Sequence, residues 1–431
     1  MQRKISLRKQ SVVLALLVVG LLLSAAEAQT ESVLYSFCAQ SHCTDGDGLF
    51  VGLTFDQKGN LYGTTYGGGA NDECGENNAE GCGIIFKLTP KGKETVLYSF
   101  CAQKGCADGA NPRAGLVLDQ KENLYGTTVG GGVHGQGVAF KLTPEGKETV
   151  LHSFCAHTDC TDGYGPYAGL VLDQKGDLYG TTQYGGAHGG GVVFKLTPEG
   201  KYTVLYSFCA HGYPCSEGAQ PVAGLVFDQK GNLYGTTLLG GGVTAYCSDV
   251  GYGCGVVFEL TPEGKETVLY SFCPQYPDCP DGTSPYAGVV FDQKGNLYGT
   301  AAHGGANGDG VVFKLTPKGK ETVLYSFCSQ TGCTDGSGPY AGVVFDQRGN
   351  LYGTTVDGGT ATCDYYSGCG VVFKLTPKGT ETALYSFCPQ TDCTDGAYPD
   401  AGLVFDQKGN LYGTTWGGGA YNEGVVFKLT P

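Results

Sequence analysis

The ten residues DQKGNLYGTT occupy positions 56–65, and the same ten letters return at positions 228–237 and 406–415. Near-copies begin at Asp119, Asp173, Asp292 and Asp346. A stretch that recurs seven times is either a functional site present in seven copies or a structural element that the fold repeats. An Asp at the entrance, a Gly in the turn and alternating Leu and Tyr afterwards are typical of a strand–turn–strand element. We therefore interpret the stretch as a building block.

The residues on either side of this element complete a repeat of four short segments. In the fourth copy these segments are VAGLVF (222–227), LYGTT (233–237), GVVFELT (255–261) and ETVLYSF (266–272). Each is rich in β-branched or aromatic residues and is bounded by a tight turn or a Gly-rich loop. Four antiparallel strands in a unit that recurs about every 55–60 residues predict the blade of a β-propeller.

The two ends of the chain share one repeat. The seventh copy ends after its third segment, VVFKLTP (425–431), and its missing fourth segment is found near the start as ESVLYSF (31–37). This arrangement is expected in a closed ring, because a blade built from both ends of the chain joins the ends and leaves no sheet edge unpaired. We predict an all-β fold: a seven-bladed β-propeller of four-stranded antiparallel blades, closed by an N-terminal outer strand that completes the last blade.

The first 28 residues have the features of a secretory signal peptide. Four basic residues precede an apolar run from Val12 to Ala26, and Ala26-Glu27-Ala28 places small residues before the expected cleavage site. We expect a leader over residues 1–28, a single propeller over residues 29–431, and a secreted protein in the extracellular or periplasmic space. An uncleaved anchor is the alternative; after cleavage no membrane span is expected. The net charge of −14 argues against a nucleic-acid partner.

The twenty cysteines fall into ten neighbouring pairs. Copies that lack one member of a loop pair lack both, as a covalent bond requires, so we predict ten local disulfides in an oxidising compartment. Zinc sites are the alternative, but they would need four converging ligands. The predicted pairs are Cys38/Cys43, Cys74/Cys82, Cys101/Cys106, Cys155/Cys160, Cys209/Cys215, Cys247/Cys254, Cys273/Cys279, Cys328/Cys333, Cys363/Cys369 and Cys388/Cys393.

The strand order sorts the connections onto two faces. The tight turns DQKGN and TPxGK share one face, which we call the turn face; the Gly-rich loops and the segments after each SFC share the other, the loop face. The loop face carries 21 acidic residues and only two basic ones, Lys104 and Arg113. Tyr-rich loops on a rigid ring suit recognition of a glycan or an extracellular protein, whereas ordinary solvated loops are the alternative. The candidate ligand-binding residues are Trp416, Tyr66, Tyr184, Tyr246, Tyr365, Tyr421, His134 and His188.

Most Cys loops also contain an aspartate. Asp45-Gly46-Asp47 resembles the start of a calcium loop, but Leu49 stands where an oxygen ligand belongs. Looser Ca²⁺ binding by facing carboxylates is the hypothesis that remains, and no other cofactor is expected. No nucleophile–base–acid set is found, so no catalytic residue is assigned. The candidate metal-binding residues are Asp45, Asp108, Asp162, Asp281, Asp335 and Asp395.

The tandem unit GLVFDQKGNLYGTT…GVVFKLTPEGKETVLYSF resembles the bacterial extracellular repeat called the GloVer repeat, found in "choice-of-anchor" tandem-repeat proteins. The resemblance covers Glu31 to Pro431. It implies secretion or cell-surface display, and no activity is established for the family. The turn D-x-x-G-N-L-Y is also similar to that of NHL-type and lactonase-like propellers. The metal-binding Glu/Asn/Asp sets of those enzymes have no counterpart here.

Three functional hypotheses follow from these observations. The first is a secreted, monomeric, disulfide-stabilised binding or scaffold module whose ligand is polysaccharide or other cell-envelope or matrix material. The second is a Ca²⁺-dependent hydrolase or lyase with carboxylates near the channel mouth. The third is a purely structural surface protein. Acids that differ between blades and cluster at the mouth would favour the enzyme, and a broad Tyr/Trp platform would favour binding.

Overall fold

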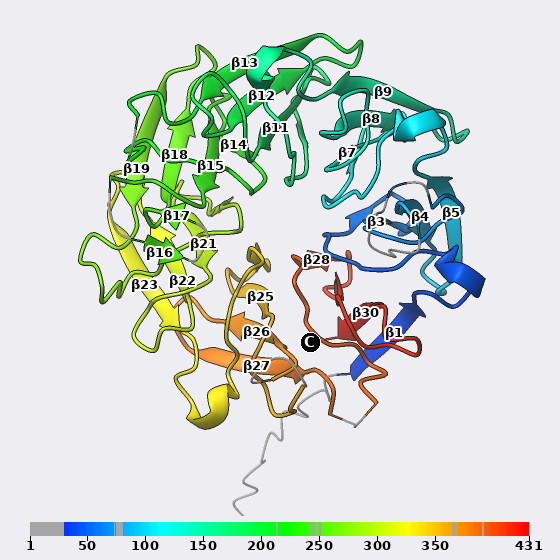
Figure 1. Ribbon diagram of the computed structural model, residues 1–431. Coiled ribbons are helices and arrows are strands. Elements are labelled where there is room, and N and C mark those ends of the chain that lie inside the picture. The colour runs from blue at the N-terminus through cyan, green and yellow to red at the C-terminus, as the bar shows by residue number, and fades with distance from the viewer. Residues whose placement is uncertain are drawn as a thin grey trace, which may run out of the picture.

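The computed structural model describes residues 30–72, 74, 81–212, 214–242, 246–248, 251–363, 368–389 and 392–430. These residues form a ring of seven four-stranded antiparallel sheets around a central channel (Figure 1). The ring confirms the predicted fold class. The expected leader, residues 1–28, lies outside the described residues. In the part of the chain that is described, no helix is long and apolar enough to cross a membrane.

Each blade runs from a short strand at the channel to a longer strand at the rim. The innermost strands are β2 (Thr54–Phe55), β6 (Val117–Leu118), β10 (Val171–Leu172), β14 (Val226–Phe227), β20 (Val290–Phe291), β24 (Val344–Phe345) and β28 (Val404–Phe405). The second strands are β3 (Leu61–Thr65), β7 (Leu124–Thr128), β11 (Leu178–Thr182), β15 (Leu233–Thr237), β21 (Leu297–Ala301), β25 (Leu351–Thr355) and β29 (Leu411–Thr414).

The third and outer strands complete the blades. The third strands are β4 (Ile84–Leu88), β8 (Val138–Leu142), β12 (Val192–Leu196), β18 (Val256–Leu260), β22 (Val311–Leu315), β26 (Val371–Leu375) and β30 (Val425–Thr430). The outer strands are β5 (Glu94–Ser99), β9 (Glu148–Ser153), β13 (Tyr202–Ser207), β19 (Glu266–Ser271), β23 (Glu321–Ser326), β27 (Glu381–Ser386) and β1 (Thr30–Ser36). A hairpin of β16 (Tyr246–Ser248) and β17 (Gly251–Tyr252) lies in the Gly-rich loop of the fourth blade.

The N-terminal strand closes the ring as predicted. Strand β1 pairs with β30 in antiparallel register, with Glu31 opposite Leu429 and Ser36 opposite Val425. Figure 1 shows the two strands, blue and red, side by side in the blade that also contains β28. The last blade therefore obtains its outer strand from the start of the chain, and the edge of β30 is covered.

The repeated Asp turn has a structural role in every copy. In the first copy, Asp56 Oδ1 accepts the backbone N–H groups of Lys58 and Asn60, each at 2.8 Å. Its Oδ2 atom accepts the Asn60 amide at 2.7 Å and the Tyr62 hydroxyl at 3.2 Å. Burial alone would raise the pKa of Asp56, but these hydrogen bonds together hold it below its ordinary value. The interpretation of DQKGNLYGTT as a building block is confirmed.

Buried phenylalanines join each blade to the next. The Phe of every SFC segment contacts the Phe of the next blade's third strand edge-to-face, with ring centroids 5.0–5.4 Å apart. Phe37 and Phe86 make this contact between the last blade and the first. Each buried Phe side chain contributes about 1.5–3 kcal/mol to stability through its burial. The seven pairs form a continuous apolar belt around the ring.

A second belt of contacts lies next to the channel. The hydroxyl of a Thr in the second strand of each blade donates to a backbone carbonyl just before the next blade's inner strand. Thr414 makes this bond to Val51 at 3.0 Å and so connects the last blade to the first. Seven such links hold the inner segments in place.

These links explain a difference from the predicted strand bounds. The first segment of the fourth blade was expected to be a strand from residue 222 to 227, but β14 contains only Val226 and Phe227. The carbonyl of Ala223 accepts the Thr181 hydroxyl of the neighbouring blade instead of pairing within its own sheet. Close packing also excludes a side chain here, since a Cβ on Gly288 would lie 2.5 Å from the carbonyl oxygen of Gly224.

Candidate functional site

One position in each blade lies at the channel mouth on the loop face and differs among the copies. It is the residue directly before Ala-Gly, or before Val51-Gly52 in the first blade, and the carbonyl of that Ala or Val accepts the Thr hydroxyl described above. This hydrogen bond fixes the backbone, so the fold itself positions the preceding side chain. All seven side chains are partly exposed. We call them the mouth ring: Phe50, Arg113, Tyr167, Val222, Tyr286, Tyr340 and Asp400.

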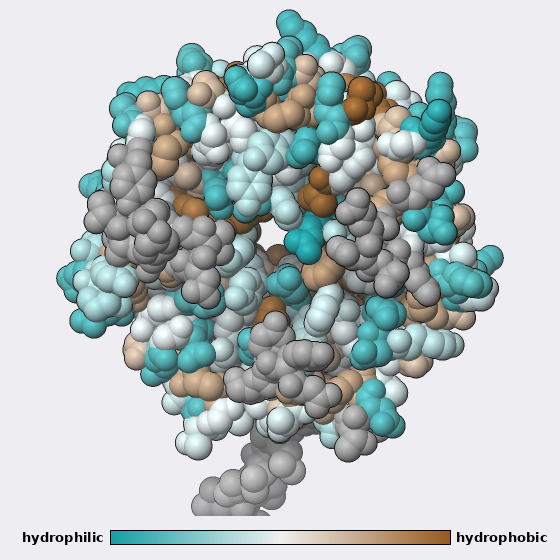
Figure 2. Space-filling view, viewed as in Figure 1, coloured by the Kyte–Doolittle hydropathy of each residue, from teal (hydrophilic) through white to brown (hydrophobic). Residues whose placement is uncertain are grey.

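Two cavities open between the mouth-ring residues. Both are lined by Phe50, Tyr340 and Asp400. The larger, about 480 Å³, is also lined by Arg113, Tyr167, Gln183, Tyr184, Val222, Leu238 and Tyr286. The smaller, about 320 Å³, adds Val356, Asp357, Tyr398 and Trp416. Figure 2 shows the channel opening at the centre of the ring, bordered by both hydrophilic and hydrophobic side chains.

Aromatic side chains surround much of the mouth. The Phe50 ring lies 5.9 Å from Tyr66 and 6.1 Å from Trp416, measured between ring centroids. Farther around the mouth, the Tyr286 and Tyr340 rings lie 4.9 Å apart. Trp416 is 41% exposed and therefore keeps a free face. The arrangement offers several flat apolar surfaces to a ligand that enters from the loop face.

The mouth also holds charged groups in close proximity. Burial raises the pKa of Asp400 to about 7; the Arg113 guanidinium opposes this shift and the Asp357 carboxylate adds to it. Burial, reinforced by Asp309, raises the pKa of Asp357 to about 6. Both acids therefore bind protons more readily than ordinary aspartates. The Tyr340 hydroxyl lies 3.4 Å from Nε2 of His303, which places a second polar pair at the edge of the cavity.

The predicted ligand-binding residues fall into three groups. Trp416 and Tyr184 line the two cavities, and Tyr66 contacts the mouth through Phe50. Tyr421, which is 52% exposed, lies outside both cavities. His134 and His188 are exposed, and no hydrogen bond or ion pair between them occurs in the described ranges. Tyr365 and the Tyr246 side chain lie outside the described residues.

The six predicted metal-binding aspartates lie in separate Cys loops. Asp45 accepts the Tyr35 hydroxyl at 2.7 Å and the backbone N–H groups of Ala39 and Gln40 at 2.9 and 3.0 Å. A tyrosine hydroxyl bonds the corresponding aspartate in four other blades, at Asp108, Asp281, Asp335 and Asp395. Within the described residues, none of the six belongs to a group of three or more metal-ligating side chains. These bonds give the carboxylates a role in loop structure, and their role in metal binding stays a prediction.

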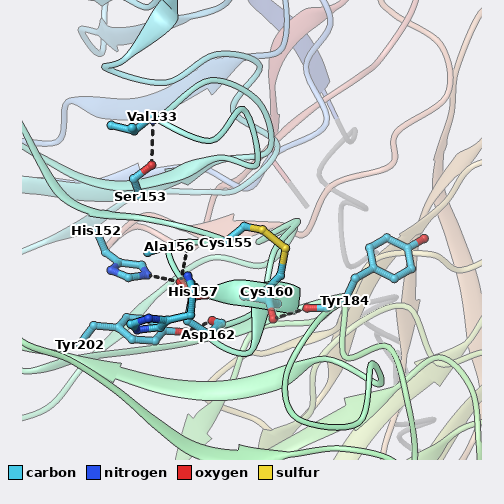
Figure 3. Close-up of polar contacts among 11 residues, drawn as sticks. Val133, His152, Ser153, Cys155, Ala156, His157, Cys160, Asp162, Tyr184 and Tyr202 are labelled. Atoms are coloured by element: carbon cyan, nitrogen blue, oxygen red, sulfur yellow. Dashed lines mark hydrogen bonds and ion pairs between the residues drawn. A yellow bond between two sulfur atoms is a disulfide. The ribbon is translucent and has the colours of Figure 1, made fainter.

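The third Cys loop, which follows the second blade, shows this arrangement with a different partner. His152 replaces the tyrosine, and its Nε2 lies 3.0 Å from Asp162 (Figure 3). The Tyr202 ring stacks on His152 with centroids 3.8 Å apart. Figure 3 also shows the Cys155–Cys160 disulfide between this contact and Tyr184, which points away from it. The disulfide loop therefore connects the rim of the blade to the residues near the mouth.

All ten predicted disulfides are present, and in the described part of the chain no cysteine is unpaired. Two of the bonds lie next to each other, with sulfurs within 4.8 Å, but all four sulfurs, those of Cys363, Cys369, Cys388 and Cys393, are used in disulfides. This confirms the disulfide interpretation over the zinc alternative. The ten bonds are Cys38–Cys43, Cys74–Cys82, Cys101–Cys106, Cys155–Cys160, Cys209–Cys215, Cys247–Cys254, Cys273–Cys279, Cys328–Cys333, Cys363–Cys369 and Cys388–Cys393.

The second cysteine of each SFC loop has a structural role that the pairing alone did not predict. Cys43, Cys215 and Cys279 adopt positive φ angles of 48°, 53° and 35°, which are uncommon for residues other than glycine. The backbone carbonyl of each accepts an N–H group of the Gly-rich loop at 2.9–3.1 Å, as Cys43 does from Gly69. None of the three lines either mouth cavity. These cysteines therefore differ from the candidate ligand-binding residues, because they attach the Gly-rich loop to the Cys loop.

Sequence reasoning missed the mouth ring as a set. An alignment of the seven copies contains the signal, because the residue before Ala-Gly is Phe, Arg, Tyr, Val, Tyr, Tyr or Asp. Its neighbours hardly vary, since Pro precedes it in six copies and Ala follows it in six. A position that varies between two constant ones marks a side chain that the repeat does not need for packing.

Several solved structures are distantly similar to the chain. A fungal alcohol oxidase of the AA5 family, in complex with copper, is 13% identical, covers 93% of this chain and 76% of its own, and gives a TM-score of 0.49. A Dyadobacter fermentans protein of unknown function is 10% identical, with 94% and 98% covered and a TM-score of 0.45. A luciferin-regenerating enzyme is 14% identical, with 74% and 90% covered and a TM-score of 0.42.

The repeat itself gives a clearer relationship. No curated protein sequence matches the chain. The sequence profile of the Gloeobacter/Verrucomicrobia repeat matches residues 20–247 and 242–431, which together include all seven blades. The chain therefore belongs to the Gloeobacter/Verrucomicrobia repeat family.

Proposed function

We propose that this protein is a secreted binding module that takes up the end of a saccharide chain at the loop-face mouth of its channel. The observation that carries the proposal is the mouth ring, where the seven-fold repeat is broken by aromatic and charged side chains around two cavities. The Phe contacts and Thr–carbonyl bonds between blades, by contrast, repeat around the ring and serve the scaffold. A ligand that is not itself seven-fold symmetric needs such an asymmetric site.

The chemistry of the mouth suits a sugar ring. The apolar C–H faces of a saccharide pack on flat aromatic side chains, and Trp416, Phe50 and Tyr340 supply such surfaces. Hydroxyl groups need hydrogen-bonding partners, and Asp400 together with Arg113 supplies acceptors and donors in the same cavity. Cavities of about 480 and 320 Å³ lie near the lower end of the range for small-molecule sites, so they fit a chain end rather than an extended polymer.

Ten disulfides support a location outside the cytoplasm. Reducing compartments keep thiols free, whereas every described cysteine here is bonded. The predicted leader over residues 1–28 would deliver the chain to such a compartment. Extracellular or periplasmic polysaccharide is then the material that the mouth ring meets.

Trp416 provides the test, because it is the only Trp in the chain and lines the smaller cavity. Its fluorescence should change on titration with members of a panel of oligosaccharides, measured with and without Ca²⁺. Tyr340→Ala should weaken the binding that wild type shows. Tyr421→Ala, on the same face but outside both cavities, is the matched control and should bind as wild type does. A panel that leaves the Trp416 signal unchanged in every case would argue against the proposal.

A second candidate, a hydrolase or lyase, is favoured by one specific observation. Asp400 and Asp357 differ from their counterparts in the other blades, line the same cavity, and have pKa values raised to about 7 and about 6. An acid with a pKa near 7 is suited to general acid catalysis at neutral pH. Release of new reducing ends or unsaturated products from a bound oligosaccharide, abolished in Asp400→Asn, would establish this activity. Retained turnover in that variant would exclude Asp400 as a catalytic residue.

A further inference from the structure

Arg113 occupies an aromatic cage at the mouth. Its Cζ atom lies 4.9 Å from the centroid of the Phe50 ring, 5.0 Å from Tyr66 and 5.6 Å from Tyr167. Each contact is within the distance at which a cation is attracted to the face of an aromatic ring. Three aromatic rings therefore hold one guanidinium in place.

Among the residues that the structure describes, the Nε donor of the caged guanidinium has no hydrogen-bond acceptor. Its Nε atom is buried and makes no hydrogen bond, and Arg113 forms none of the ion pairs found in the described residues. Leaving a buried donor unsatisfied costs about 1–3 kcal/mol. Asp400 lines the same cavity and acts on Arg113 only through its charge, without an ion pair between them. Arg113 therefore brings an unpaired donor and an unneutralised charge to the wall of the larger cavity.

The geometry of the cage determines which ligand atoms fit. Aromatic rings take up contacts around the guanidinium, whose N–H groups lie in its plane and form a fork. That fork matches a carboxylate, which accepts two parallel hydrogen bonds. A neutral hydroxyl would use one donor and would leave the charge unpaired. The cage is thus better suited to an anion than to a neutral sugar.

The position of Arg113 on an otherwise acidic face also favours an anionic ligand at this point. Arg113 and Lys104 are the only basic residues on a loop face with 21 acidic ones. Lys104 is exposed in a turn of the second Cys loop, η2 (Lys104–Cys106), whereas Arg113 lines the cavity at the channel mouth. Bulk charge on this face repels anions, so the single caged cation creates selectivity at one point only.

We propose that the Arg113 guanidinium binds the carboxylate of an acidic saccharide, a uronic acid residue at the end of a chain whose sugar ring stacks on the mouth aromatics. The inference rests on the proposed function and names its ligand class. Phe50, Tyr66 and Tyr167 orient the guanidinium, and the carboxylate supplies the acceptors that the protein does not.

Asp400 makes this binding depend on pH. Its carboxyl faces Arg113, Asp357 and Tyr286, each of which it affects or is affected by electrostatically. An incoming uronate adds a negative charge nearby and so favours the protonated form of Asp400. Binding is therefore coupled to proton uptake, and the affinity should rise as the pH falls from about 8 to about 6. Asp357, whose pKa is raised as well, acts in the same direction.

The experiment compares a negatively charged ligand with its uncharged ester. Trigalacturonate and its methyl ester are titrated by calorimetry into the full mature protein. Wild type should bind the acid about tenfold more tightly than the ester, as expected for a paired, charge-assisted contact. Arg113→Gln should equalise the two ligands, and Arg113→Lys, which keeps the charge but loses the fork, should retain part of the preference. Lys104→Gln is the matched control and should preserve all of it.

Three outcomes would overturn the inference. Equal binding of acid and ester by wild type would exclude the carboxylate contact while leaving the proposed function intact. Equal loss in Lys104→Gln and Arg113→Gln would assign the preference to bulk charge. Absence of binding by either ligand, or by neutral oligosaccharides, would refute the proposed function as well. Unfolding temperatures of the variants near that of wild type ensure that a loss reflects the site, and Asp400→Asn should flatten the pH dependence of trigalacturonate affinity.

Discussion

Six glutamates at the blade interfaces should make the protein less stable above neutral pH than below it. Each begins or nearly begins an outer strand, and each has its Oε1 atom buried without a hydrogen-bond partner. Burial raises the pKa of every one to about 7, and an acidic residue of a nearby loop adds to the shift. The six residues are Glu31, Glu94, Glu148, Glu266, Glu321 and Glu381. The corresponding residue in the remaining blade is Tyr202.

The direction of the pH dependence follows from whether the folded or the unfolded state binds the proton more tightly. A carboxyl with a higher pKa in the folded state than in the unfolded state favours folding when it is protonated. Its contribution is complete below about pH 4.5 and is lost as the pH rises through about 7. A shift of this size is equivalent to about 3 kcal/mol for a fully buried group. These side chains are partly exposed, so solvent screening reduces the figure to about 1 kcal/mol each.

The six sites lie in separate interfaces, so their effects should add to about 6 kcal/mol. The Asp turns do not offset this change, because the pKa is lowered at Asp56, Asp119, Asp292, Asp346 and Asp406, and a carboxyl with a lowered pKa loses its stabilising contribution only in acid. His152, whose pKa burial lowers, titrates below neutral pH and is a single group. The free energy of unfolding should therefore fall between about pH 4.5 and about pH 7.5 and change little above that range.

Guanidinium denaturation at several pH values, followed by circular dichroism, measures this change. Glu94→Gln should remove about 1 kcal/mol of the pH dependence and should stabilise the protein at pH 8.5. Glu263→Gln, in an exposed turn, is the matched control and should leave the profile unaltered. A free energy of unfolding that stays constant or rises from about pH 5 to about pH 7.5 would refute the reasoning, since it would mean that these carboxyls are not desolvated in the folded ring.

Four further results are expected. Phe327→Ala should lower the free energy of unfolding by about 3–5 kcal/mol, because it removes a fully buried side chain of the apolar belt. The control, Tyr421→Ala, should change the free energy of unfolding by less than about 0.5 kcal/mol. Chemical denaturation measures both values. Asp56→Ala should cost about 1–3 kcal/mol by leaving its turn donors unpaired, and Asp56→Asn should recover part of this loss. Alkylation before reduction should label no cysteine of the folded protein, and labelling after reduction should add twenty groups by mass spectrometry. Deletion of residues 30–36 should expose β30 and cause aggregation, which a synthetic peptide of that segment should suppress in light-scattering assays.

The repeat made most of the fold predictable from the sequence. Strand β3 has the bounds expected from LYGTT, and β1 pairs with β30 as the shared repeat indicated. These features depend on local sequence patterns, and each pattern could be read in seven copies of the repeat. The ten disulfides were predictable for the same reason, since each closes a loop of five to eight residues. The inner strands came out shorter than expected, because their contacts are made with the neighbouring blade and leave no periodic signal.

The candidate site was only partly predictable. Trp416 and Tyr184 were selected from their place on the loop face, and both line the mouth cavities. Arg113 and Asp400 were not selected, because they lie in different blades and only ring closure brings them near each other. The sequence separation between Arg113 and Asp400 does not indicate that they lie near each other. A comparison of equivalent positions across the copies does carry it, and such a comparison is available for any ring built from repeats.

The place of the mouth ring in the repeat explains why variation is tolerated there. The following residue, such as Ala223, uses its backbone carbonyl to bind the neighbouring blade, and this bond is independent of the side chain before it. One position later the chain packs closely in two of the blades, where a Cβ on Gly288 or Gly115 would lie within 3 Å of a backbone carbonyl oxygen. The residue before Ala-Gly is thus held by backbone contacts, while its own side chain lies at the channel mouth, where Phe50 contacts Trp416 and Tyr340 contacts His303. A substitution at this position alters the mouth but leaves the Thr–carbonyl hydrogen bonds between blades in place, because these bonds use the backbone of the next residue. A seven-fold scaffold can therefore acquire an asymmetric site one residue at a time.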